Sequence, residues 1–297
     1  MIRTRRWLLA ASALAATTLT GCSSLGTLNG LNAVTPGDGG VRLVAQDIPF
    51  GPDPRQQLDV YAPRGANRAP VVVFFYGGSW RTGSKRDYGF AARAIAARGF
   101  VVVVPDYRLV PQVRYPAFVE DGAAAVAWTA ANAGRYGGDP ARIGVTGHSA
   151  GAYIALMLTV DRRWLAKAGA AGAIKAAVGL AGAYDFYPFD PGGAAEAAFG
   201  QFPDPRDTQP VTHASAGAPP VLLLTGDADT TVKPRNATAL AAALTAAGAS
   251  ATVKTYPGIG HIGIILAVSK PFRGKAPVLA DMTTFLDARL EPQSPPR

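Results

Sequence analysis

The chain has 297 residues, of which 48% are hydrophobic and 16% are charged, so it can form a large apolar core and is not expected to be disordered. Lys and Arg number 29 against 20 Asp and Glu, which gives a net charge of +9. Three of the positive residues, Arg3, Arg5 and Arg6, lie near the N-terminus, and the others form no run of like charge. We therefore expect a solvated surface and no nucleic-acid partner.

The N-terminus has the pattern of an export signal. A basic start, MIRTRRW, precedes the apolar segment LLAASALAATTLT, which is too short for an ordinary transmembrane helix. Residues 1–21 are therefore predicted to be a signal peptide. The next residue completes Leu-Thr-Gly-Cys, which resembles the lipobox of bacterial lipoproteins. The resemblance implies lipidation of Cys22, the single cysteine, and an exported bacterial lipoprotein anchored to a membrane, with the periplasmic face of the outer membrane as the expected location.

Two segments flank the predicted folded domain. Residues 22–40 are small, polar and glycine-rich, which is typical of a flexible tether. Residues 291–297, EPQSPPR, are predicted to form a disordered tail. Residues 41–290 are predicted to form a single domain.

Within that domain, short apolar runs alternate with longer helical patterns. The first two strands are predicted at 41–50 and 56–63 and are expected to pair antiparallel. Further strands are predicted at 69–78, 100–107, 142–147, 174–185, 219–227 and 250–258, and helices at 87–99, 118–134, 236–248, 276–290 and directly after residue 149. This order indicates an α/β fold with a mostly parallel sheet of about eight strands and helices on both faces. Functional groups are then expected at the carboxyl ends of the strands.

Ser149 lies at one of these strand ends, in Gly-His-Ser-Ala-Gly between a predicted strand and a predicted helix. This is the context of a nucleophile elbow, where small neighbours allow a sharp turn. The alternative is a helix N-cap serine flanked by turn glycines. A serine nucleophile needs a general base within hydrogen-bond reach.

The sequence offers only three histidines as that base. His148 is adjacent to Ser149 and is expected to point elsewhere, and His213 precedes a strand. His261 follows the last predicted strand, so it is the candidate base. Asp227 and Asp229 both follow the seventh strand, and either of them is a candidate to orient the imidazole.

A glycine pair after the third strand supplies candidate oxyanion donors. The backbone N–H groups of Gly77 and Gly78, with that of Ala150 after the elbow, are predicted to stabilise a developing negative charge. No histidine cluster or cysteine pair has metal-ligand spacing, so we expect no metal and no organic cofactor.

Together these motifs resemble the α/β-hydrolase superfamily, in particular the carboxylesterases related to hormone-sensitive lipase and feruloyl esterases. Matching stretches include VVVFFYGGSW, VVVVPDYRL, GGDPARIGVTGHSAGAYIA, TGDADTTV and GIGH, and they extend over most of residues 58–261. The resemblance implies an α/β-hydrolase fold and selects Asp229 as the acid, because Gly-x-x-Asp-x-x-Val is similar to the acid loop of that superfamily. Related enzymes commonly have histidine where this chain has Tyr76, whose hydroxyl is expected to brace the loop in its place.

The predicted function is hydrolysis of small carboxylic esters, with a preference for short acyl chains, by the triad Ser149, His261 and Asp229. Two alternatives remain at this point. An aryl formamidase would use the same elbow and glycine loop, and a surface-binding module would keep the fold without catalysis.

Overall fold

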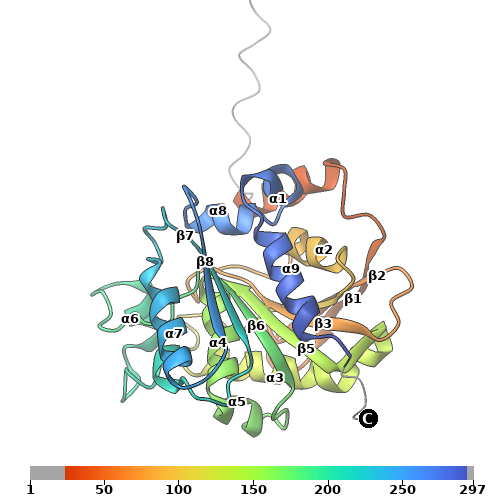
Figure 1. The fold of residues 1–297 in the computed structure, drawn as a ribbon. Coiled ribbons are helices and arrows are strands. Elements are labelled where there is room, and N and C mark those ends of the chain that lie inside the picture. Colours follow the sequence, from red (N-terminus) through yellow and green to blue (C-terminus); the bar gives the residue numbers. More distant parts are fainter. Residues whose placement is uncertain (1–23, 293–297) are drawn as a thin grey trace, which may run out of the picture.

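The computed structural model describes residues 24–292, which fold around one eight-stranded sheet (Figure 1). The order of the strands across the sheet is β1-β2-β4-β3-β5-β6-β7-β8. The strands are β1 (Val41–Pro49), β2 (Gln57–Pro63), β3 (Ala69–Phe75), β4 (Val101–Pro105), β5 (Gly138–His148), β6 (Ile174–Leu180), β7 (Val221–Gly226) and β8 (Ala251–Tyr256). The predicted sheet is confirmed in strand number and in chain position. The predicted signal peptide, Cys22 and residues 293–297 lie outside the described residues.

Helices cover both faces of this sheet. The α-helices are α1 (Ser24–Val34), α2 (Gly89–Ala96), α3 (Ala117–Asn132), α4 (Ala150–Val160), α5 (Arg162–Lys167), α6 (Ala194–Phe199), α7 (Arg235–Ala246), α8 (His261–Leu266) and α9 (Val278–Arg289), and the 3-10 helices are η1 (Ala133–Tyr136), η2 (Pro210–His213) and η3 (Lys270–Lys275). Helices α2 and α9 pack together on one side, and α3, α4 and α5 pack together on the other (Figure 1). Every residue of α4 is buried, which fits its run of small and aliphatic side chains.

Strand direction follows the hydrophobic pattern. All residues of β4 and β7 are buried, as expected for parallel strands covered on both faces. The edge strand β1 alternates between half-buried and exposed residues and pairs antiparallel with β2, as predicted. The sheet is parallel from β4 through β3 to β8, so these strands all end at one edge. The predicted site residues come directly after β3, β5, β7 and β8.

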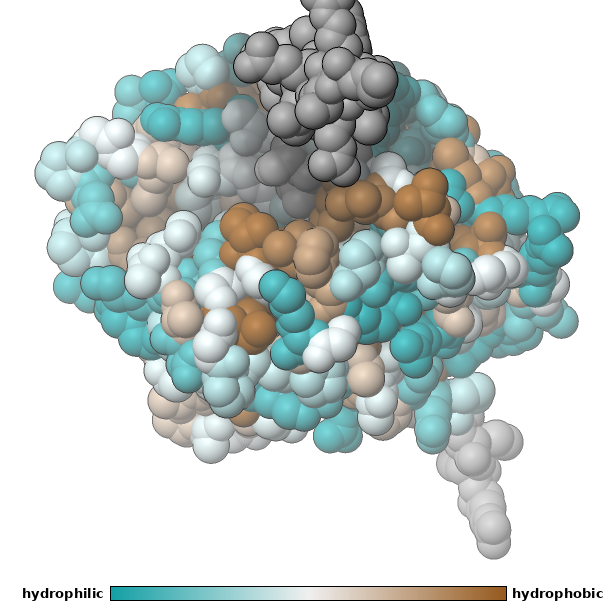
Figure 2. Space-filling view, turned by 90° about the horizontal axis from the view of Figure 1, so that it is seen from above, coloured by the Kyte–Doolittle hydropathy of each residue, from teal (hydrophilic) through white to brown (hydrophobic). Residues whose placement is uncertain are grey.

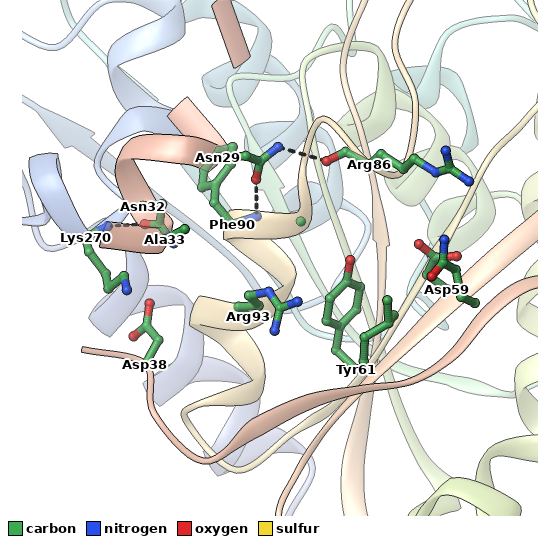
Figure 3. Close-up of a pocket in the computed structure, with 13 residues that line it drawn as sticks. Asn29, Asn32, Ala33, Asp38, Asp59, Tyr61, Arg86, Phe90, Arg93 and Lys270 are labelled. Atoms are coloured by element: carbon green, nitrogen blue, oxygen red, sulfur yellow. Dashed lines mark hydrogen bonds between the residues drawn. The ribbon is translucent and has the colours of Figure 1, made fainter. Parts of the chain in front are cut away.

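The predicted flexible tether is wrong for most of its length, because Ser24–Val34 forms helix α1. Leu28 is buried in the core. The Asn29 side chain donates to the carbonyls of Arg86 and Asp87 and accepts from the Phe90 N–H, at the start of α2 (Figure 3). The glycine-rich composition indicated flexibility. The burial of Leu28 and the hydrogen bonds of Asn29 instead hold this segment against the domain as a helix.

Helix α1 is also tied to the C-terminal part of the chain. The carboxamide oxygen of Asn32 accepts a hydrogen bond of 2.8 Å from the Lys270 N–H (Figure 3). Helix α1 is therefore held to the folded body at both Asn29 and Asn32.

A buried ion cluster lies beneath the loop between β3 and α2. Lys85 is 2% exposed, and its ammonium group lies 3.4 Å from Asp59 and 3.7 Å from Asp106, with Asp47 also in contact. Burial lowers the pKa of Lys85, but these carboxylates outweigh it and the pKa is raised. The cluster therefore holds a charged lysine inside the fold and fixes the loop that follows Gly77 and Gly78.

Lys85→Met is expected to lower the free energy of unfolding by about 3 kcal/mol, because it leaves buried carboxylates without their cation. Urea unfolding followed by circular dichroism measures this change. Lys167→Met is the matched control, since the Lys167 side chain is 72% exposed in its pair with Glu120 and should contribute less than about 1 kcal/mol. Equal effects of the two substitutions would contradict a structural role for the Lys85 cluster.

Candidate active site

Ser149 occupies a strained turn between β5 and α4. Its backbone has φ 54° and ψ −120°, a conformation that non-glycine residues rarely adopt. The turn brings backbone segments so close that a Cβ on Gly147 would overlap the Gly151 backbone, and one on Gly151 would overlap the Phe75 carbonyl. The two glycines are therefore required by packing, and they bring the Ser149 hydroxyl to the carboxyl edge of the sheet.

The structure places the three predicted triad residues in contact. The Ser149 hydroxyl lies 2.9 Å from Nε2 of His261, and Nδ1 of the same ring lies 2.8 Å from Oδ2 of Asp229. These residues come from three separate strand ends. The His261 side chain is 10% exposed and that of Asp229 is fully buried, so little water reaches their contact.

Asp229 is held by its own loop. Its Oδ1 accepts hydrogen bonds from the N–H groups of Thr231 and Val232, at 2.9 and 2.8 Å, which leaves Oδ2 for the histidine. Asp227 is exposed and accepts a bond from the Gly258 N–H, which ties the turn after β8. The geometry therefore selects Asp229, and Asp227 serves the turn.

The oxyanion loop follows β3 and passes close to Tyr88. The Gly77 amide faces the Tyr88 hydroxyl and opposes the effect of burial, which raises the pKa of Tyr88. The role of Gly77 as an oxyanion donor stays a prediction. Gly78 has φ +139°, and its carbonyl accepts from the N–H groups of Arg81 and Thr82. Within the described residues, the amides of Gly78 and Ala150 have no acceptor.

Tyr76 braces this loop as expected. Its ring is fully buried and stacks on Tyr107 at 4.5 Å, and the Tyr107 hydroxyl donates to the Tyr76 carbonyl. Arg55, which the sequence reasoning did not identify, donates to the Tyr76 hydroxyl at 2.7 Å and to the Gly83 carbonyl at 3.0 Å. Arg55 comes from the turn before β2, so no local pattern indicated its role.

His148 is buried at the end of β5 and contacts the triad from behind. Its Nε2 lies 3.2 Å from the carbonyl oxygen of His261, and its Nδ1 lies 3.1 Å from the Tyr88 hydroxyl. Burial, together with the nearby His261 ring, lowers the pKa of His148 to about 3. The sequence predicted only that His148 points away from Ser149, and it did not predict the contacts with Tyr88 and His261. His213, by contrast, contacts the Asp207 carbonyl.

Aromatic side chains fill the space beside the elbow. Trp80 is 5% exposed and Tyr153 is fully buried, and their rings meet edge to face at 5.5 Å. Phe186 and Phe199 pack on both. Trp80 and Tyr153 are therefore part of the core, and the Trp80 indole N–H has no hydrogen-bond partner among the described residues.

A cavity of about 530 Å³ lies elsewhere, between α1, α2 and the first two strands (Figure 3). None of the residues that line it belongs to the triad or the oxyanion loop, and two of its polar side chains, Asn29 and Asn32, hold α1 to the domain. Within residues 24–292, no cluster of His, Cys, Asp and Glu could hold a metal ion.

The sheet order, the elbow and the contacts of Ser149, His261 and Asp229 define an α/β-hydrolase fold with a serine-hydrolase site. The BD-FAE family model matches residues 58–244, and the chain belongs to that family.

Similar proteins are esterases by name. Esterase LipC of Mycobacterium tuberculosis is 32% identical over 71% of this chain and 58% of its own length. Isoprenylcysteine alpha-carbonyl methylesterase ICME of Arabidopsis thaliana is 31% identical over 81% of this chain and 61% of its own length. The chain thus spans about three-fifths of these curated relatives. A truncated carbohydrate esterase from gut microbiota shares the fold, with a TM-score of 0.75 at 21% identity over 87% of this chain and all of that one.

The buried, neutral His148 predicts a pH dependence of stability. Its pKa falls from 6.5 in the unfolded chain to about 3 in the fold, so the unfolded state binds the extra proton and stability is lost as pH falls below 6.5. Between pH 7 and pH 5, wild type is expected to lose about 2 kcal/mol more than His148→Gln. Urea unfolding at the two pH values measures the difference. Equal losses would mean that His148 does not titrate in this way.

Proposed function

We propose that the chain is a carboxylic ester hydrolase that works through an acyl-enzyme on Ser149. The observation that carries the proposal is the continuous contact from the Ser149 hydroxyl through the His261 ring to Asp229. The esterase names of its relatives support the same reaction class. The intact contacts argue against a binding module without catalysis.

In the first half-reaction, the Ser149 oxygen attacks the ester carbonyl carbon while its proton passes to Nε2 of His261. Asp229 stabilises the imidazolium through Nδ1. The amides of Gly77, Gly78 and Ala150 are the donors that would stabilise the oxyanion. The C–O bond to the alcohol then breaks, and the alcohol leaves with the proton from His261.

In the second half-reaction, water attacks the acyl-enzyme carbonyl and gives a proton to His261. The Ser149 oxygen leaves with that proton, so the acid is released and the enzyme is restored. No group beyond water and the ester is needed for this balance.

Ser149→Ala is expected to lower the turnover of p-nitrophenyl acetate by about 10⁴-fold or more, because the nucleophile is lost. The exposed Ser250 at the start of β8 provides the control, and Ser250→Ala should keep wild-type turnover. A fluorophosphonate probe should label wild type and not the Ser149 variant. Labelling of the variant would place the nucleophile elsewhere.

The same assay across acyl lengths tests the proposed preference for short chains. The aromatic cluster of Trp80, Tyr153, Phe186 and Phe199 fills the interior beside the elbow, so acetate and butyrate esters are expected to be cleaved faster than laurate. Faster cleavage of laurate would contradict this preference. Faster cleavage of an aryl formamide such as N-formylkynurenine would favour a formamidase.

We further propose that Cys22 carries a lipid that holds the enzyme at a bacterial membrane, with the periplasmic face of the outer membrane as the location. The face that contains α1 and α8 has brown apolar side chains between polar ones (Figure 2), and Leu31 and Val34 of α1 are exposed. No helix between Ser24 and Pro292 is long and apolar enough to span a membrane.

Replacement of the lipid acceptor tests the proposed anchor. In a bacterial host, Cys22→Ala is expected to move the protein from the membrane fraction to the soluble periplasmic fraction. Wild type should incorporate a labelled fatty acid and the variant should not. Equal membrane association of both proteins would contradict an anchor at Cys22.

A further inference from the structure

The His148 ring joins two loops of the site through bonds whose direction can be assigned. Its Nε2 lies 3.2 Å from the carbonyl oxygen of His261, and a carbonyl can only accept a hydrogen bond. Nε2 therefore carries the proton. A neutral imidazole then has an acceptor at Nδ1, so the Tyr88 hydroxyl, 3.1 Å away, is the donor.

The chain of contacts continues into the oxyanion loop. The Tyr88 oxygen faces the Gly77 amide, and a Cβ on Gly77 would lie only 2.9 Å from Nδ1 of His148 and 3.0 Å from the Tyr88 hydroxyl. Tyr88 and His148 are each 2% exposed, so water does not compete for these bonds. Gly77, Tyr88, His148 and the His261 carbonyl thus form one buried relay of contacts, which we call the rear relay.

The rear relay contacts the backbone of His261, whereas the triad contacts only its side chain. The triad contacts orient the imidazole ring, but the backbone of His261 lies at the very start of α8, after a glycine-containing turn. His148 is the last residue of β5 and precedes Ser149 directly. A bond from its ring to the His261 carbonyl therefore ties the backbone of the base to the strand that carries the nucleophile.

The charge of His148 also matters for the reaction. The rings of His148 and His261 have centroids 5.0 Å apart. The other groups that contact the His148 ring are the Tyr88 hydroxyl and the His261 carbonyl, neither of which carries a charge. A neutral His148 lets His261 accept the serine proton without a second positive charge beside it.

We propose that His148 is a positioning residue, which holds the His261 backbone and the oxyanion loop in register with Ser149 through the rear relay. The proposal rests on the proposed serine hydrolase activity. His148 itself does not touch the substrate or transfer a proton.

The test compares two amides that replace different nitrogens of the ring. In His148→Gln the amide nitrogen reaches the position of Nε2 and can still donate to the His261 carbonyl. In His148→Asn the amide group reaches only the position of Nδ1. His213 provides the matched control, because its Nε2 also lies against a backbone carbonyl, that of Asp207, at 2.8 Å.

His148→Asn is expected to lower kcat for p-nitrophenyl acetate by about 10- to 100-fold, the range for a buried group left without its partner, with KM within about twofold of wild type. His148→Gln should recover most of the loss, and His213→Asn should keep wild-type kcat. Because His148 is neutral, the pH midpoint of kcat should stay the same in the His148→Asn variant. Wild-type kcat in that variant, or a pH midpoint moved by about one unit, would overturn the proposal.

If His148→Asn does not fold, Tyr88→Phe tests the relay by itself, since it should lower kcat while KM stays within about twofold of wild type, and unchanged kcat would overturn the proposal. If His148→Asn folds, the double variant should lose no more kcat than His148→Asn alone. The unfolding midpoint of each variant, measured in urea, distinguishes a variant that loses kcat because it unfolds from one that folds but no longer holds His261 in position. Independent, multiplicative losses in kcat would show that the two side chains do not act as one relay.

Fluorophosphonate labelling separates this proposal from the assigned reaction. The rate of labelling reports the Ser149–His261 pair and needs no particular ester. If wild type is labelled but cleaves none of the esters, the ester assignment fails, and slower labelling of His148→Asn still supports the relay. Equal labelling rates in wild type and His148→Asn would overturn it. Absence of labelling in wild type would refute both.

Discussion

The close approach of backbone segments at the elbow is the constraint on which the rest of the site depends. Ser149 can hold its strained conformation only because Gly147 and Gly151 let β5, α4 and the end of β3 pack without side chains between them. The same packing brings the loop after β3 beside the amide of Ala150. The nucleophile and the oxyanion donors are therefore products of one packing arrangement, and a side chain at either glycine would displace both.

Two buried polar systems then hold the surrounding loops in place. In front of the sheet edge, Arg55 and Tyr76 fix the start of the oxyanion loop, and Lys85 fixes its continuation through Asp59 and Asp106. Behind the triad, His148 joins that loop to the backbone of the catalytic base. Tyr76 and Lys85 in the first system, and Tyr88 and His148 in the second, are buried, so their polar groups depend on protein partners. Arg55 reaches the hydroxyl of Tyr76 and so holds this side chain at the start of the oxyanion loop.

The position of α1 affects how an anchored enzyme would present its site. The flexible tether predicted for residues 22–40 would let the domain turn freely above a membrane. Helix α1 instead joins the body through Leu28, Asn29 and Asn32, so an anchor at Cys22 would fix the distance and the direction of the domain. Under the proposed anchor, the face with α1 and α8 would lie toward the membrane (Figure 1). Helix α8 begins with His261.

The sequence by itself determined the sheet, the order of its strands along the chain and the candidates Ser149 and His261, because each depends on a local pattern, whereas the choice of Asp229 over Asp227 came from the resemblance to a known family. Continuous apolar runs indicate buried parallel strands, and residues directly after them must meet at one edge. The tertiary structure decided what depends on groups far apart in the chain. Composition could not reveal that Asn29 caps α2, that the Gly77 amide faces Tyr88, or that Arg55 reaches Tyr76. Such bonds form only after the sheet has brought distant loops together, so no short stretch of sequence contains both partners.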